Sequence, residues 1–139
     1  MDETRASRFS DDVDPALPWP EYPRPQLRRA DWTNLNGAWD LAIAAIGDGQ
    51  PASYDQTVLV PYPIGSTLSG IDHTLLPSET AWMRRSFDLD PAAVNGRVRL
   101  RFGGVDWDCT VWCNGVEVGR HRGAHDPWHV DITAALSDG

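Results

Sequence analysis

Alternating hydrophobic and polar residues predict short β-strands along most of the chain, and no longer window carries a helical period. Strands are expected at residues 38–43, 57–60, 82–89, 97–102, 110–113, 116–118 and 128–132. Glycine, proline and aspartate separate these runs, as is usual for turns between strands. The pattern therefore favours an antiparallel all-β fold, a sandwich of short strands.

The clearest local signal is the pair Asn114-Gly115, which lies between two runs of β-forming residues. Both residues accept the positive φ that a two-residue type I′ turn requires, so the sequence predicts a hairpin. The predicted register pairs Cys113 with Val116, Trp112 with Glu117, Val111 with Val118 and Cys109 with Arg120. The face that carries the valines and cysteines is expected to be core, and the other face to be exposed.

Outside the strands, three segments have no regular pattern. The longest, Tyr62 to Ser78, is a candidate site loop, since a long structureless loop in a compact domain usually has a function. Gly119 to Pro127 is expected to form another loop. Residues 1–20 are acidic and rich in proline, so we expect a disordered or loosely docked leader that docks through Leu17 and Trp19, followed by one domain over residues 21–139.

Composition excludes several partners. The net charge is −8 and the chain has no lysine, which argues against nucleic acid and against an anionic membrane surface as partners. No apolar run approaches the roughly 20 residues of a membrane span, and the leader lacks the features of a signal peptide. A cytoplasmic location is therefore expected.

The chain offers few groups for catalysis. Acid–base hydrolysis generally needs two carboxyl groups in prepared positions, but glutamate occurs only at Glu3, Glu21, Glu79 and Glu117, and most aspartates lie in predicted turns. We expect this chain to contain no catalytic residue and to be inactive by itself.

Metal and cofactor sites are not expected either. His121, His125 and His129 would align on a helix, but glycines and β alternation in the same segment argue against one. Cys109 and Cys113 lie about 13 Å apart on one predicted strand, beyond disulfide reach. The spacing fits small core residues better than metal ligands, so no metal and no cofactor are predicted.

Seven tryptophans make the aromatic content more informative. Tryptophan has a large apolar ring with one polar handle, which suits both sugar stacking and protein interfaces. Trp107, between Asp106 and Asp108, is the best candidate for a ligand or partner contact. Trp112 could equally cover an interdomain surface.

A series of short motifs then identifies a resemblance over about residues 22 to 136. The motifs lie, in order, at Tyr22–Leu27, Trp32–Trp39, Val60–Ile64, Leu68–Ile71, Trp82–Phe87, Arg99–Trp107, Val111–Gly115, Val118–Gly123 and Pro127–Thr133. Together they resemble the N-terminal sugar-binding domain of glycoside hydrolase family 2, the group of β-galactosidase, β-mannosidase and β-glucuronidase. The chain departs from the pattern at Met83, at Gly65-Ser66 and at Ala124.

The resemblance implies a jelly-roll-like β-sandwich of the galactose-binding-domain-like type. It also implies a non-catalytic accessory domain of a β-glycosidase, whose partners are an immunoglobulin-like domain and a TIM barrel of the same parent chain, with a carbohydrate substrate. The residues expected to contact the sugar or the barrel are Asp72, His73, Asp106, Trp107, His121 and Asp126.

The family continues beyond the position of Gly139 into a hydrophobic strand. We therefore expect the sandwich to be truncated, to lack its last strand, and to expose an edge that could pair in a homo-oligomer. Two other functions stay open: an independent carbohydrate-binding module and a structural interaction domain. The sequence does not specify which sugar is bound.

Overall fold

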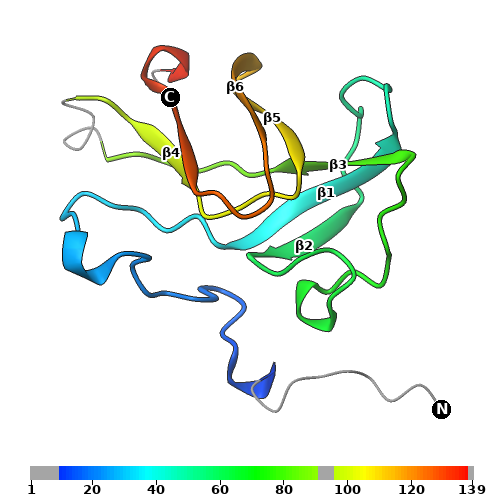
Figure 1. The fold of residues 1–139 in the computed structure, drawn as a ribbon, viewed down its shortest axis with the longest axis horizontal. Helices are drawn as coiled ribbons and strands as arrows, with labels where there is room; N and C mark the ends of the chain where they lie inside the picture. Colours follow the sequence, from blue (N-terminus) through cyan, green and yellow to red (C-terminus); the bar gives the residue numbers. More distant parts are fainter. Residues whose placement is uncertain (1–9, 91–95, 138–139) are drawn as a thin grey trace. The chain divides into compact units, whose positions relative to one another are not determined.

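The computed structural model describes residues 10–90 and 96–137, and all strand pairs in these ranges are antiparallel (Figure 1). The predicted all-β class is thus confirmed. The chain forms two compact units, residues 1–87 and 88–139. Residues 1–9 of the expected leader lie outside the described residues, as do residues 91–95 and 138–139.

A three-stranded sheet forms the centre of the first unit. Its strands are β1 (Gly37–Ala45), β2 (Gln56–Val60) and β3 (Glu79–Arg84), and β1 lies between the other two (Figure 1). Leu41 packs with Val58 and Ile71 in the core, and Trp39 and Ile43 lie against them, as the alternation predicts. Ala42, on the opposite face, is buried as well. Trp39 lies at the edge of this core and donates a hydrogen bond from Nε1 to the Leu35 carbonyl, 2.8 Å away.

Strand β3 begins and ends earlier than the sequence predicts, so the boundaries predicted at residues 82–89 are wrong. The physical reason for the early end of β3 is Arg85, the residue that follows the strand. Its Nη1 donates to the carbonyl oxygens of Leu35 at 3.1 Å and Asn36 at 3.0 Å, in the segment that leads into β1. Gly37 makes room for this group, because a Cβ at residue 37 would lie 2.9 Å from Nη1. The chain leaves the β1–β3 ladder where this guanidinium turns toward the carbonyls.

The described part of the leader lies against the start of β1. Pro18 is fully buried, and Asn36 Nδ2 donates to its carbonyl oxygen at 3.2 Å. Asn34 Nδ2 donates to the carbonyl oxygen of Trp19, also at 3.2 Å. The side chains of Leu17 and Trp19 remain 42% and 64% exposed. The buried contact is therefore made by Pro18 and not by the two residues that the sequence suggests.

The first half of the β2–β3 loop is fixed by two serines around a short 3-10 helix, η3 (Thr67–Ser69). Ser66 Oγ accepts a hydrogen bond from the amide of Ser69 at 3.2 Å. Ser69 is buried, and its hydroxyl donates to the Ser66 carbonyl at 2.8 Å and accepts from the amide of Ile71 at 3.1 Å. These local bonds direct Ile71 into the core.

A carboxylate fixes the second half of the same loop. Glu79 Oε2 accepts from the amide of Leu76 and lies 2.8 Å from His73 Nε2. The Leu76 N–H first, and His73 second, hold the pKa of Glu79 below its usual value of 4.5, since both stabilise the ionised carboxylate. The β2–β3 loop, which the sequence selects as a candidate site, is thus held by hydrogen bonds in both of its halves.

The second unit contains two pairs of strands. Strand β4 (Arg99–Phe102) pairs with β7 (Trp128–Asp131), and β5 (Asp108–Cys113) pairs with β6 (Val116–Arg122). Arg99 and Arg101 are exposed on β4, as the alternation predicts. Val130, Ile132 and Ala135 are the buried hydrophobic residues in the described part of this unit.

The β5–β6 hairpin confirms the predicted turn but not the whole predicted register. Asn114 and Gly115 have φ of 48° and 79°, and the first two predicted pairs are present. Beyond them the ladder shifts between Val111 and Trp112, so that Val111 lies opposite Gly119 and Val118 is an extra residue. This β-bulge reverses the predicted orientation of every later residue on β6, because side chains alternate between the two faces of a strand.

The bulge brings Gly119 and His121 to the side of the hairpin that faces β7. A Cβ on Gly119 would overlap the side chain of Val130. The His121 ring stacks on Trp128 with centroids 4.7 Å apart, and Trp128 stacks on Phe102 at 4.5 Å. The predicted loop from Gly119 to Pro127 is correspondingly shorter, because β6 extends to Arg122.

The tip of the hairpin is tied to the segment after β7. Asn114 Nδ2 donates to the carbonyl oxygen of Ala135 at 2.9 Å and lies 3.3 Å from Ser137 Oγ. Ala135 belongs to the short 3-10 helix η5 (Thr133–Ala135). The turn residue Asn114 therefore also makes a tertiary contact.

The close approach of Gly119 to Val130 generates a test of the bulged register. Gly119→Ala is expected to lower the free energy of unfolding by about 1–3 kcal/mol, measured by urea denaturation, because the added methyl overpacks the contact. Gly49→Ala is the control, since nothing lies within 4 Å of a Cβ there. An equal effect of both variants would contradict the observed register.

The Glu79 contacts predict a pH-dependent effect on stability. The pKa of Glu79 is lowered in the folded state, so its contribution is complete above the unfolded value of 4.5 and is lost as the pH falls through the folded value. Glu79→Gln should therefore lower the melting temperature at neutral pH, and the difference from the wild type should shrink in acid. Melting curves of both proteins from neutral to acid pH check this expectation. A difference in melting temperature that is constant with pH would contradict a stabilising role of the ionised Glu79 carboxylate.

Candidate functional site

Two loops of the second unit lie side by side at the end of the β5–β6 hairpin. The amide of Gly123 donates to the Trp107 carbonyl oxygen at 2.7 Å. At Gly104 the backbone approaches Ala124 so closely that a Cβ would lie 2.7 Å from the Ala124 carbonyl oxygen. The segment before β5 and the segment after β6 are thereby held together, and both carry residues that the sequence selects as contacts.

Trp107 lies in the segment before β5, where the two loops meet, and its ring is exposed. The side chain is 60% exposed, and the Arg122 guanidinium carbon lies 5.5 Å from the ring centroid, within the range of a cation–π contact. Arg122 is held in turn by Asp108, with 2.7 Å between Nη2 and Oδ2. Asp106 precedes Trp107 and is exposed. The geometry therefore fixes an amphipathic ring while leaving much of its surface open to a ligand.

His121 and Asp126 meet at Gly123. This glycine has φ of 135°, and a Cβ at residue 123 would lie 3.4 Å from His121 Nε2 and 3.5 Å from Asp126 Oδ2. Because Gly123 also binds the Trp107 carbonyl, Trp107, His121 and Asp126 gather around one residue. We name this set, with Gly123, the Gly123 cluster.

His121 differs from its predicted environment. The sequence places it in a loop, whereas it lies in β6 opposite Cys109 and stacks on Trp128. Its Nε2 is buried without a hydrogen-bond partner among the described residues, and so is Trp128 Nε1. Burial raises the pKa of the Cys109 thiol and so disfavours the reactive thiolate. This agrees with the expectation that Cys109 packs as a small core residue.

The remaining predicted contacts belong to the first unit. Asp72 is exposed on the β2–β3 loop, and His73 is bound to Glu79. Both side chains are held on a loop whose backbone is fixed at Ile71 and Leu76. Their role as sugar or barrel contacts stays a prediction, as it does for the residues of the second unit.

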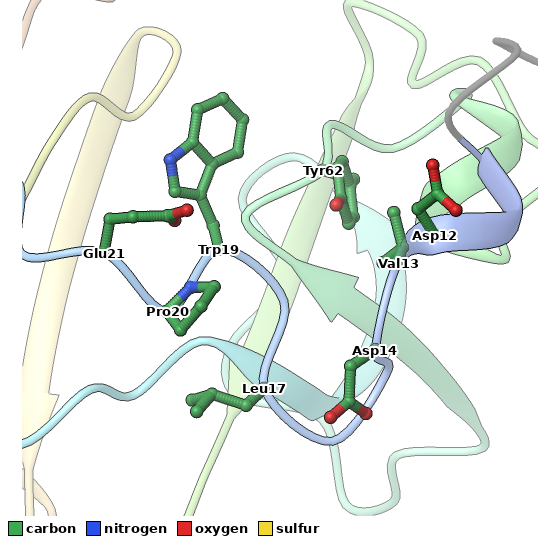
Figure 2. Close-up of a pocket in the computed structure, with 8 residues that line it drawn as sticks. All are labelled: Asp12, Val13, Asp14, Leu17, Trp19, Pro20, Glu21 and Tyr62. Carbon is green, nitrogen blue, oxygen red and sulfur yellow. The ribbon is translucent and has the colours of Figure 1, made fainter.

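The first unit also contains a hollow that sequence reasoning missed (Figure 2). It has a volume of about 580 Å³, and its lining residues are Asp12, Val13, Asp14, Leu17, Trp19, Pro20, Glu21 and Tyr62. Figure 2 shows the rings of Trp19 and Tyr62 at this hollow, with carboxylates on either side. The leader has no periodic pattern from which this hollow could have been predicted. The signal in the sequence was Trp19, which stands between Pro18 and Pro20.

Residues 10–90 and 96–137 contain no group of three or more histidine, cysteine, aspartate or glutamate side chains that could hold a metal ion. Across the same ranges no helix is long and apolar enough to cross a membrane.

Comparison with known proteins finds β-glucuronidases and a β-galactosidase among the relatives of this chain. β-Glucuronidase of Canis lupus familiaris is 30% identical over 85% of this chain, and β-galactosidase of Thermoanaerobacter pseudethanolicus is 25% identical over 78%. The structure of a Faecalibacterium prausnitzii β-glucuronidase matches 83% of the chain with a TM-score of 0.63 and 26% identity, which supports the predicted all-β sandwich. The chain spans about a fifth of the length of these β-glucuronidases.

The family model for glycosyl hydrolases family 2, sugar binding domain, matches residues 25–139. This range includes the central sheet of the first unit and the hairpin, and it carries all six predicted contact residues. The resemblance seen in the sequence motifs is confirmed, and the chain belongs to glycosyl hydrolase family 2 as a sugar-binding domain of that family.

Proposed function

We propose that this chain is the N-terminal accessory domain of a β-glycosidase and that the hydrolysis is performed by another domain. The family match and the β-glucuronidase and β-galactosidase relatives support this assignment. The expected partners are the immunoglobulin-like and TIM-barrel domains of the same polypeptide. The expected substrate is a carbohydrate with a β-glycosidic bond.

The environments of two glutamates support a non-catalytic role. Glu79 is bound by the Leu76 amide and His73, and Glu117 forms an ion pair with Arg120 at 2.8 Å. In each case these contacts lower the pKa of the carboxyl group. A glycosidase general acid needs the opposite shift, toward a carboxyl that keeps its proton near neutral pH. Neither group is prepared for that task.

The observation that carries a role in sugar contact is the exposed ring of Trp107, a member of the Gly123 cluster that is held by Arg122. An exposed and oriented indole suits the apolar face of a pyranose, and neighbouring carboxylates suit its hydroxyls. We place the sugar or barrel contact of the second unit at Trp107, with Asp106, His121 and Asp126 around it. The same exposure also favours the second candidate, an independent carbohydrate-binding module.

Activity measurements on the complete polypeptide and on this chain test the proposal. The complete polypeptide is expected to hydrolyse at least one of the p-nitrophenyl β-glucuronide, β-galactoside and β-mannoside substrates, and residues 1–139 alone should hydrolyse none. A complete polypeptide that is inactive on a broad set of β-glycosides would contradict the glycosidase assignment. Hydrolysis by residues 1–139 would contradict the accessory role.

A substitution tests the contact itself. Trp107→Ala in the complete polypeptide should lower kcat/KM for the active substrate about fivefold or more, which corresponds to about 1 kcal/mol of lost interaction. Trp32→Ala is the control, because Trp32 is also exposed, at 39%, but lies outside the Gly123 cluster and does not line the hollow in Figure 2. Unchanged kinetics in Trp107→Ala, with the fold intact by circular dichroism, would remove Trp107 from the site.

A further inference from the structure

The outward side of the β5–β6 hairpin is a continuous polar surface with a tryptophan at each end. Three cross-strand pairs form it, Asp108 with Arg122, Thr110 with Arg120, and Trp112 with Glu117. We call these six residues the hairpin face. Their common orientation results from the bulge at Val118, which turns both arginines away from β7.

The charges of the hairpin face neutralise one another. Arg120 binds Glu117 through two bonds, Nε to Oε1 at 2.8 Å and Nη2 to Oε2 at 2.9 Å. Arg122 binds Asp108 at 2.7 Å. The face therefore carries no net charge. Each guanidinium still has N–H donors beyond those used in these bonds, because arginine has five.

Aromatic rings bracket this polar surface. Trp112 is 45% exposed at the turn end, and Trp107 contacts Arg122 at the other end. Asp108 and Trp112 are four residues apart on β5, so the face is about 13 Å long. This length exceeds that of one pyranose ring. An open depression of about 360 Å³ lies on it, lined by Asp108, Thr110, Arg120, His121 and Arg122.

The chemistry of the face selects among occupants. A strongly charged partner gains little, because the face has no net charge to complement. An apolar protein surface would remove water from two exposed ion pairs without replacing its hydrogen bonds, which is unfavourable. A neutral saccharide chain avoids both penalties, since its hydroxyls replace water at the guanidinium and carboxylate groups while its ring faces stack on tryptophan.

From these observations we infer that the hairpin face binds a neutral oligosaccharide of at least two sugar units, continuing from Trp107 to Trp112. This inference rests on the proposed function, since it extends the sugar contact at Trp107 away from the Gly123 cluster. It assigns Trp112 to ligand binding, where the sequence left an interdomain contact equally open.

Calorimetric titration of residues 1–139 with hexasaccharides tests the inference. The probes are β-1,4-linked hexamers of glucose, mannose and xylose, and at least one is expected to bind saturably. Trp112→Ala should weaken that binding about tenfold or more, because truncating a central aromatic contact has effects of this size. Trp112→Phe should bind within about threefold of the wild type, since a stacking ring remains. Trp32→Ala, the matched control, should bind as the wild type does, because Trp32 is exposed but lies outside the hairpin face.

Several outcomes would overturn the inference. These are no saturable binding of any hexamer, equal binding by the wild type and Trp112→Ala, and binding by this chain that is lost in the complete polypeptide. The last result would mean that another domain covers the face. Hydrolysis of p-nitrophenyl monosaccharides by the complete polypeptide is measured in parallel, so that failure of the glycosidase assignment is distinguished from failure of the hairpin face.

Discussion

The β-bulge at Val118 decides which side chains of the second unit face β7 and which face solvent. With one extra residue in β6, Gly119 and His121 turn toward β7, while Arg120 and Arg122 turn outward. The opposite orientation would place two guanidinium groups against Val130 and Trp128, where burial of unpaired charge is strongly unfavourable. The ring stack, the two outward ion pairs and the position of Arg122 beside Trp107 all depend on this one-residue shift.

The first unit depends on a different interaction, in which the Arg85 guanidinium donates to several backbone carbonyls. Arg85 ends the pairing of β3 with β1 and at the same time satisfies the carbonyls of Leu35 and Asn36. Asn36 in turn holds Pro18 through its side chain. The position of the leader, and with it the hollow in Figure 2, is thus linked through a short chain of hydrogen bonds to the end of a strand.

The sequence predicted what local patterns determine. The central strand around Leu41 follows from alternation, and the hairpin turn follows from the φ values that Asn114 and Gly115 accept. It did not predict the end of β3, because Arg85 leaves the strand for carbonyls about fifty positions earlier. The bulge had a visible signal in Gly119, since a glycine inside a strand pattern often marks a bulge or a close approach.

The candidate site shows the same division. Trp107 could be selected from its type and its loop, and the structure places it with His121 and Asp126 around Gly123. The strand position of His121 and its stacking on Trp128 required tertiary information. The paired charges of the hairpin face also required it, because Asp108 and Arg122 are brought together only by the shifted register.

The turn at Asn114 has a consequence for the chemical ageing of the protein. An asparagine followed by glycine is the dipeptide most prone to deamidation, since glycine offers no side chain to hinder attack by its backbone nitrogen on the amide. The attack expels ammonia and forms a succinimide, which takes up water to give aspartate or isoaspartate, and neither product has an Nδ2 to donate to Ala135. A carboxylate oxygen would then face the Ala135 carbonyl. Deamidation would thus remove the hydrogen bond between the hairpin tip and η5, and the isoaspartate product would also lengthen the main chain within the turn.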